Sequence, residues 1–186
     1  MNNQISTRRI LKCTEAHLLR HRGIEHKISL SHRLSNKVMR AIMEIEQKAF
    51  RPELRYSREE LSRRMKEENF LVIMVYVSGS PVGFAMGYRE PQEAASFYMD
   101  TLATVIEKKR IGSTLFHLTS ILCFKQGFHH VTVRTEEKDD RERSPKKFYE
   151  KLGFYQIPCD PCEGIGMRKD LDQQTINEYA HHLCVE

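Results

Sequence analysis

The stretch "MDTLATVIEKKRIGSTLF" (Met99–Phe116) joins the end of a strand-like segment to three consecutive cations, a single glycine and an apolar helical pattern. The segment from Ala95 to Val105 alternates as a strand, and Ser113–Lys125 has the apolar spacing of an amphipathic helix. The first turn of a helix has backbone N–H groups without partners and a partial positive charge, which together suit a bound phosphate. The sequence therefore predicts an anion-binding loop at this junction.

The side chains of this loop fit the same prediction. Gly112 allows a close approach, Ser113 and Thr114 offer hydroxyl donors, and residues 108–110 supply positive charge. An ordinary strand–helix turn with solvated lysines is the alternative that the stretch alone leaves open. The loop has neither the Walker nor the Rossmann glycine pattern. Its place at the carboxyl end of a strand is nevertheless where open α/β sheets bind ligands.

Further elements are predicted on both sides of this junction. Residues 1–33 have no clear pattern except a short strand at 25–33. Strands are predicted at 70–77, 82–90, 95–105, 129–136, 153–157 and 165–171, and helices from Ser35, from Ser57 to about Glu68, at Ser113–Lys125, from Ser144 and at Asp172–Leu183. This order predicts a mixed sheet with helices on its faces and a right-handed parallel crossover through the Ser113 helix.

The composition indicates one soluble domain over residues 1–186. Hydrophobic residues make up 40% and charged residues 30% of the chain, which suits a globular protein. The longest apolar run, Phe70–Val77, is far shorter than the roughly 18 to 20 residues of a membrane helix. The N-terminus does not resemble a signal peptide, and five cysteines are an odd number for a disulfide framework. A cytoplasmic protein without membrane contact is therefore expected.

Charge is unevenly distributed along the chain. Residues 1–66 contain 16 Lys and Arg against 7 Asp and Glu, a net charge of +9, whereas the remainder has 14 against 18, a net charge of −4. A basic first third could meet nucleic acid or an acidic partner. A solvated helical face is the favoured interpretation, because no zinc-finger or helix-turn-helix signature accompanies the charge, and nucleic-acid binding is not expected.

The opening stretch, together with "KKFYEKLGF" (Lys146–Phe154), resembles the GNAT superfamily of acetyl-CoA-dependent N-acetyltransferases. The family motif Q/R-x-x-G-x-G/A falls on Glu107–Gly112, where Gly112 is kept and Arg110 occupies the place of the first glycine. The segments "IMEIEQKAF" (42–50), "SREEL" (57–61) and "GSPVGFAMG" (79–87) are similar to the family's N-terminal half. The resemblance extends over roughly residues 36–171.

This resemblance implies an α/β (α+β) fold with a mixed, mostly antiparallel sheet of six to seven strands, helices on both faces and a splay between strands 4 and 5. The splay is expected beyond Leu102, with acetyl-CoA inserted into it as a cosubstrate. The residues implied in cofactor binding are Leu102, Ala103 and Thr104 through their backbone, Lys108, Lys109, Arg110, Ile111, Gly112, Ser113 and Thr114 in the loop, and Ser144 and Phe148 downstream. For Ser144, a role as helix N-cap is the alternative.

Acetyl transfer to an amine needs a base for the nucleophile and an acid for the thiolate leaving group. Tyr149 matches the tyrosine that the family commonly uses as the acid. Asp100, Glu136 and Glu137 are the candidate bases, and Glu137 precedes Tyr149 by a spacing similar to that in ribosomal-protein N-terminal acetyltransferases. Solvated or ion-paired carboxylates are the alternative for all three, and a packing role is the alternative for Tyr149.

A second candidate site lies in the C-terminal third. Cys159 and Cys162 form a C-x-x-C pair, and His181, His182 and Cys184 could complete a zinc site if the terminal helix folded back. A proline-set turn and a polar tail are the favoured alternative, so no metal is expected. Cys123 is predicted to be a buried packing residue rather than a nucleophile.

The prediction is an acyltransferase that moves the acetyl group of acetyl-CoA directly to a primary amine, acting as a monomer or homodimer. A protein N-terminus, a lysine, a polyamine and an aminoglycoside all remain open as the acceptor. The alternative is a non-catalytic CoA-binding or zinc-stabilised interaction module with a basic N-terminal surface.

Overall fold

The computed structural model describes residues 6–106, 110–139, 141–160 and 164–184 of the chain. Its strands form one seven-stranded sheet in the order β1-β2-β3-β4-β5-β7-β6. The strands are β1 (His26–Ser31), β2 (Leu71–Val77), β3 (Ser80–Arg89), β4 (Ser96–Thr104), β5 (His130–Thr135), β6 (Tyr155–Ile157) and β7 (Ile165–Asp170). The helices are α1 (Thr7–Arg22), α2 (Asn36–Ala49), η1 (Pro52–Leu54), α3 (Arg58–Arg64), α4 (Ile111–Lys125), α5 (Pro145–Lys151) and α6 (Gln173–Cys184).

The sheet is mixed and mostly antiparallel, which confirms the predicted fold class. Only β4 and β5 pair in parallel, through the crossover helix α4, and their register extends from Ser96–His130 to Tyr98–Thr132. The splay between them therefore begins after Tyr98, and the prediction that it begins beyond Leu102 is wrong by four residues. The reason is an irregularity in β4, described below, that turns the strand away from β5 before Leu102 is reached.

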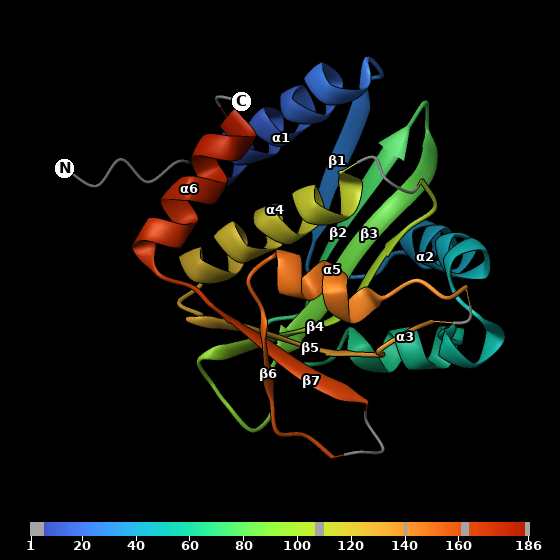
Figure 1. The fold of residues 1–186 in the computed structure, drawn as a ribbon. Coiled ribbons are helices and arrows are strands. Elements are labelled where there is room, and N and C mark those ends of the chain that lie inside the picture. Colours follow the sequence, from blue (N-terminus) through green and yellow to red (C-terminus); the bar gives the residue numbers. More distant parts are fainter. Residues whose placement is uncertain (1–5, 107–109, 140, 161–163, 185–186) are drawn as a thin grey trace.

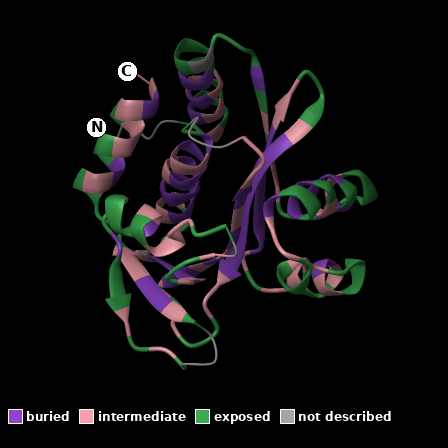
Figure 2. Cartoon of the chain, turned by 45° about the vertical axis from the view of Figure 1, so that its right-hand side comes forward, coloured by how far each residue is buried: buried purple, intermediate pink, exposed green. Residues whose placement is uncertain are grey.

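Helices cover both faces of the sheet (Figure 1). On one face α2 packs against β3 and β4, and α3 lies beside it. On the other face α4 packs against β3 and β4, and α1 and α6 lie over α4. Helix α4 is therefore enclosed between the sheet and two outer helices. In Figure 2 the buried residues form continuous bands along the sheet and along α4.

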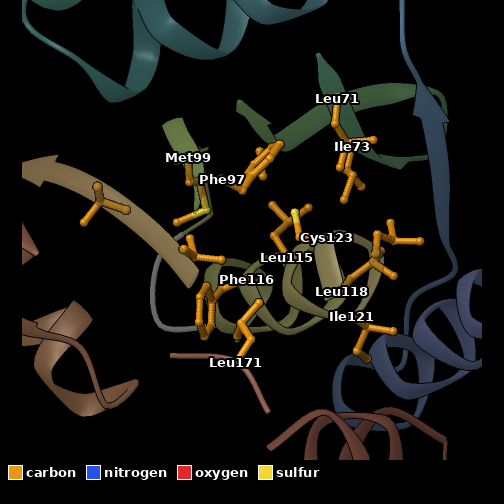
Figure 3. Close-up of a cluster of buried hydrophobic side chains, with 14 of the residues drawn as sticks. Leu71, Ile73, Phe97, Met99, Leu115, Phe116, Leu118, Ile121, Cys123 and Leu171 are labelled. Carbon is orange, nitrogen blue, oxygen red and sulfur yellow. The ribbon is translucent and has the colours of Figure 1, made fainter. Parts of the chain in front are cut away.

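The larger of the two cores surrounds α4 (Figure 3). Phe97 and Met99 from β4 meet Leu115 and Phe116 from α4, and all four side chains are almost completely buried. Because α1 and α6 cover the outer side of α4, this helix is apolar around most of its circumference. Cys123 is fully buried there, as predicted for a packing residue.

Most predicted elements are present, with shifted boundaries. Ser35 caps α2, and Ser57 and Glu60 form the predicted capping box of α3. Helix α3 ends at Arg64 rather than near Glu68, and α4 begins at Ile111 rather than Ser113. Helix α1 has no counterpart among the predicted elements. Among the residues that the structure describes, no helix combines the length and apolar character needed to cross a membrane.

Candidate active site

The parting of β4 from β5 leaves one edge of β4 available to a ligand. Beyond Tyr98, the residues of β4 continue to pair with β3, with Leu102 opposite Ala85 and Thr104 opposite Gly83. No described residue of β5 pairs with Leu102, Ala103 or Thr104. An extended chain carrying amide groups can bind to such an edge as an added strand does. The predicted pantetheine-binding residues therefore lie where such binding is possible.

A β-bulge in β4 produces this divergence. Met86 of β3 pairs with Thr101, and Tyr88 pairs with Tyr98, so Gly87 alone lies opposite two residues of β4. Such a bulge bends the strand and changes the direction of its side chains. Phe97 and Met99 of this strand face the core around α4, whereas the Asp100 side chain meets Tyr56 and Arg64 on the α3 face of the sheet.

Arg110, which stands in the place of the motif's first glycine, has a backbone conformation that favours glycine. It is the N-cap of α4 with φ 61° and ψ 1°, in the left-handed region that glycine occupies at little cost. Its carbonyl accepts hydrogen bonds from the backbone N–H of Thr114 at 2.9 Å and from the Ser113 hydroxyl at 3.0 Å. Arg110 thus begins α4 with a backbone conformation open to glycine, and its side chain adds a guanidinium.

The start of α4 fits an anionic group. No acidic residue lies in the first turn of this helix. The Thr114 hydroxyl is buried and has no hydrogen-bond partner within the described chain. At Gly112 an added Cβ would meet the Phe148 ring at 3.4 Å, so Phe148 lies directly against this glycine. The Ile111 side chain is buried in the core, which leaves only its backbone for a ligand. Lys108 and Lys109 lie outside the described residues.

Tyr149 lies on α5 within a group of aromatic rings. Its ring centroid is 5.2 Å from that of Phe148 and 5.2 Å from that of Phe154. The residue is 9% exposed, and burial raises the pKa of its phenol above the ordinary value. The hydroxyl therefore stays protonated at neutral pH and is able to donate a proton. Ser144 accepts a hydrogen bond from Lys147 N at 3.4 Å, so it has the N-cap role that was one of its two alternatives.

Asp100 is a buried carboxylate with two partners. Its side chain is 2% exposed, it accepts a hydrogen bond from the Tyr56 hydroxyl at 3.0 Å, and Arg64 lies 3.7 Å away. The Arg64 guanidinium also donates to the Tyr88 hydroxyl at 2.6 Å. Burial raises the pKa of Asp100, whereas the charge of Arg64 and the Tyr56 hydrogen bond oppose this rise. The carboxylate thus connects β4 to α3 and the loop before it.

The other two candidate bases are also ion-paired. Arg51 donates to both oxygens of Glu136, at 2.7 and 3.1 Å, in a bidentate pair that joins the loop after α2 to the end of β5. Glu137 is 62% exposed and pairs with Lys146 at 2.9 Å. The structure therefore places Asp100 and Glu136 in fixed, partly buried pairs and Glu137 in solvent.

Glu46 is a further buried carboxyl group near Asp100, and the sequence analysis did not identify it. It is fully buried on α2, and its Oε2 accepts a hydrogen bond from Tyr56 N at 3.0 Å. Its Oε1 has no hydrogen-bond partner in the described part of the chain. Burial raises the pKa of Glu46 to about 7, and the nearby charge of Asp100 adds to this effect. Its helical spacing from Ile42 and Ala49 was the signal that it faces the core.

Replacing Glu46 by glutamine is expected to stabilise the fold at alkaline pH by up to about 3 kcal/mol. Because the folded-state pKa of about 7 lies above the ordinary 4.5, the wild type is most stable below pH 4.5 and loses stability as the pH rises to 7. Glutamine stays neutral, so the gain should appear at pH 8 and vanish near pH 4. Urea denaturation at both pH values measures this, with the exposed Glu44→Gln as control. An equal gain at both pH values would show that titration is not the cause.

The residues of the candidate zinc site lie in separate surroundings. Cys159 interacts within the β6–β7 turn, where its thiol is 3.1 Å from Gly164 O. His182 and Cys184 lie on α6, and the His182 ring contacts those of His17 and His117. Cys162 lies outside the described residues. Within the part of the chain that is described, no three His, Cys, Asp or Glu side chains are arranged to hold a metal ion.

Comparisons with known proteins bear on this site. The chain is similar to an aminoglycoside 6'-N-acetyltransferase in complex with coenzyme A, at 19% identity and a TM-score of 0.64, over 77% of this chain and 96% of that one. It is similar to the ribosomal-protein-S18-alanine N-acetyltransferase of Escherichia coli, at 17% identity and a TM-score of 0.60, over 78% and 95%. The PaiA N-acetyltransferase of Thermoplasma acidophilum, in complex with coenzyme A, has 17% identity and a TM-score of 0.58, over 78% and 99%.

At identities of 17 to 19%, the structural similarity shows a shared fold and no more. Membership of a family rests on the match between the sequence and a family model. No match was found among curated protein sequences. The model of the acetyltransferase (GNAT) family matches residues 39–154, which include the split between β4 and β5, the start of α4 and Tyr149. The chain therefore belongs to the GNAT family of acetyltransferases.

Proposed function

We propose that this chain transfers the acetyl group of acetyl-CoA to a primary amine by direct attack within a ternary complex. The observation that carries the proposal is the open edge of β4 beyond Tyr98, next to a helix start headed by Arg110 and Gly112. The edge suits the amides of pantetheine, and the helix start suits a pyrophosphate. Two solved proteins of this fold, named above, are complexes with coenzyme A.

The residues proposed to hold acetyl-CoA come from three elements. Leu102, Ala103 and Thr104 offer backbone groups on β4. The first turn of α4 offers the amides of Ile111 and Gly112 and the hydroxyls of Ser113 and Thr114, while Arg110, with Lys108 and Lys109, supplies charge. Phe148 packs against Gly112 and would border the bound cosubstrate. Ser144 caps α5 by accepting a hydrogen bond from Lys147 N, which leaves its O–H proton available to donate to the cosubstrate.

Tyr149 is the proposed general acid. The amine nitrogen attacks the thioester carbonyl, a C–N bond forms, and the C–S bond breaks. Tyr149, whose phenol is protonated at neutral pH, gives its proton to the departing sulfur. The proton lost by the amine passes through water to a carboxylate, for which Glu136, Asp100 and Glu137 are the proposed candidates.

The proposed acceptor is a primary amine. Two of the similar structures are named for amine acceptors of different size, an aminoglycoside and the alanine of a ribosomal protein. A screen of N-terminal peptides, lysine, polyamines and aminoglycosides, followed by release of CoA, identifies the class. Release of CoA with none of these amines, while acetyl-CoA still binds, would argue for the interaction-module alternative.

Replacing Arg110 by glycine is expected to separate the effect of its charge on acetyl-CoA binding from the effect of its strained backbone on stability. The substitution should weaken acetyl-CoA binding roughly tenfold, because a charged contact to phosphate is lost. It should also stabilise the free protein by about 1 kcal/mol, because glycine adopts a positive φ without strain. Calorimetric titration and urea denaturation measure the two effects.

Ser78→Gly is the matched control for this prediction. Ser78 also has a positive φ, of 48°, but lies in the β2–β3 turn. It should gain stability without any change in acetyl-CoA affinity. Unchanged affinity of Arg110→Gly would remove Arg110 from the binding site, and absence of acetyl-CoA binding by the wild type would contradict the proposed function.

A further inference from the structure

Four histidine rings meet where α1 and α6 pack on α4. The His17 ring centroid lies 4.4 Å from that of His21 and 4.7 Å from that of His182. The His182 ring in turn lies 5.3 Å from the ring of His117 on α4. We refer to these four residues as the histidine cluster. Helices α1 and α6 both lie outside residues 39–154, which match the family model, so the cluster joins two additional helices to the family's own α4.

The centre of the cluster accommodates neutral imidazoles. His17 is fully buried, and neither of its ring nitrogens has a hydrogen-bond partner among the described residues. The Nδ1 atom of His117 is likewise buried without a partner there, and the His117 ring stacks on Tyr179 of α6 at 4.3 Å. A proton added to His17 would therefore introduce a buried charge with no described acceptor, which is costly.

The charged groups that face the cluster make protonation more costly. Arg20 from α1 and Arg110 from the start of α4 both lower the pKa of His17, together with His21 and His182. His182 and His17 lower the pKa of His117. Burial is the largest cause for both, and the pKa of each falls from 6.5 to about 4. Cys13 and Cys184 also meet where α1 packs on α6, and burial together with the Cys13 contact raises the pKa of Cys184 to about 12, while Arg9 and Arg20 oppose this rise.

We propose that the histidine cluster is a proton-sensitive latch, which fastens α1 and α6 to α4 when its rings are neutral and releases both helices when they are protonated. The two helices lie together and make extensive contacts with α4 (Figure 1), so they would leave as a unit. Because the folded-state pKa values lie below 6.5, the latch is closed above pH 6.5 and weakens as the pH falls toward about 4.

The latch also connects to the cosubstrate, and this part rests on the proposed function. Arg110 contributes positive charge both to the field at His17 and to the start of α4. A bound pyrophosphate would offset that charge and ease protonation of His17. By linkage, protonation of the latch would in turn favour pyrophosphate binding as long as the helices stay docked. The latch itself is tested without any cosubstrate, so its failure is distinguishable from failure of the proposed function.

Hydrogen–deuterium exchange of the full chain tests the latch. Protection factors, corrected for the intrinsic pH dependence of exchange, are compared between about pH 7.5 and about pH 5. In the wild type, protection of α1 and α6 should fall by about tenfold or more, whereas that of β3 and β4 should not fall, because protonation of Glu46 stabilises the fold over the same pH range. His17→Gln, which cannot be protonated, should reduce this fall and leave only the part that His117 contributes. His129→Gln removes an exposed histidine at the far end of α4 and should respond like the wild type.

Each outcome of this experiment decides the proposal. A fall confined to α1 and α6 that is smaller in His17→Gln supports the latch. A fall that is uniform along the chain, or that is as large in His17→Gln as in the wild type, overturns it. If His17→Gln does not fold, His117→Phe, which keeps the stack on Tyr179, takes its place. The wild type alone still tests the latch, because its fall in protection must be confined to α1 and α6. Stoichiometric zinc in the purified protein, measured by elemental analysis, would also overturn it, because a response to pH could then come from acid release of the metal instead of protonation of free imidazoles.

Discussion

Replacing Tyr149 by phenylalanine is expected to lower kcat by about 100-fold, the typical contribution of a general acid. The fold should be retained, because the ring contacts with Phe148 and Phe154 do not involve the hydroxyl. Acetyl-CoA affinity should also be retained, since the proton is needed only when the thiolate departs. Steady-state kinetics with a good acceptor and calorimetric titration of acetyl-CoA measure the two quantities.

Tyr155→Phe is the matched control for the acid. It removes the hydroxyl of an exposed tyrosine that bonds Asp170 on the neighbouring strand, and it should leave kcat unchanged. A loss of acid catalysis should be smallest with acetyl donors whose leaving thiol has a low pKa, because such thiolates depart without a proton. An unchanged kcat with the ordinary thioester would transfer the role of acid to another group.

Replacing Gly87 by alanine is expected to destabilise the fold by about 3 kcal/mol, at the upper end of the usual cost of overpacking. An added Cβ would lie 2.2 Å from the Tyr98 carbonyl oxygen and 2.6 Å from the Phe97 ring. The first of these atoms belongs to the backbone of the neighbouring strand, so relief requires β3 and β4 to separate at the bulge. Urea denaturation measures the loss, and the same shift would disturb Asp100.

Gly112→Ala provides the comparison for this substitution. Its added Cβ would make an ordinary contact with the Phe148 ring at 3.4 Å, and alanine is favoured over glycine within a helix. Gly112→Ala should therefore keep or increase stability. Equal stability of the two variants would mean that the strands at Gly87 are not held as closely as the structure has them.

Local signals explain why most elements could be predicted from the sequence. The Ser57–Glu60 capping box and the Ser35 cap each depend on residues within one turn of the helix that they begin. The antiparallel hairpin of β2 and β3 and the proline that opens α5 are equally local. The start of α4 was placed correctly as a strand–helix junction for the same reason.

Helix α1 shows why other parts could not be predicted. Its buried face consists of Ile10, Thr14, His17 and Leu18, two of which are polar, so the apolar period is interrupted. Helix α1 packs on β1, which follows it directly, and also on α4 and α6, which lie more than ninety residues later in the chain. The candidate site also depends on contacts between residues far apart in the sequence. The carboxylates Asp100 and Glu136 could be predicted as candidates, but their partners Arg64 and Arg51 are brought to them only by the folded arrangement.

The short parallel pairing of β4 and β5 has a consequence for how the chain folds. The strands β2–β4 come from residues 71–104 and pair antiparallel with their neighbours in sequence, as β6 and β7 do. Such local pairings close short loops and cost little entropy. The parallel pairing extends only from Ser96 to Tyr98 and must await the α4 crossover. Cooperativity between the two halves of the sheet therefore depends on the side chains of α4, which lie in one core with Phe97 of β4 and Val131 of β5, more than on backbone pairing.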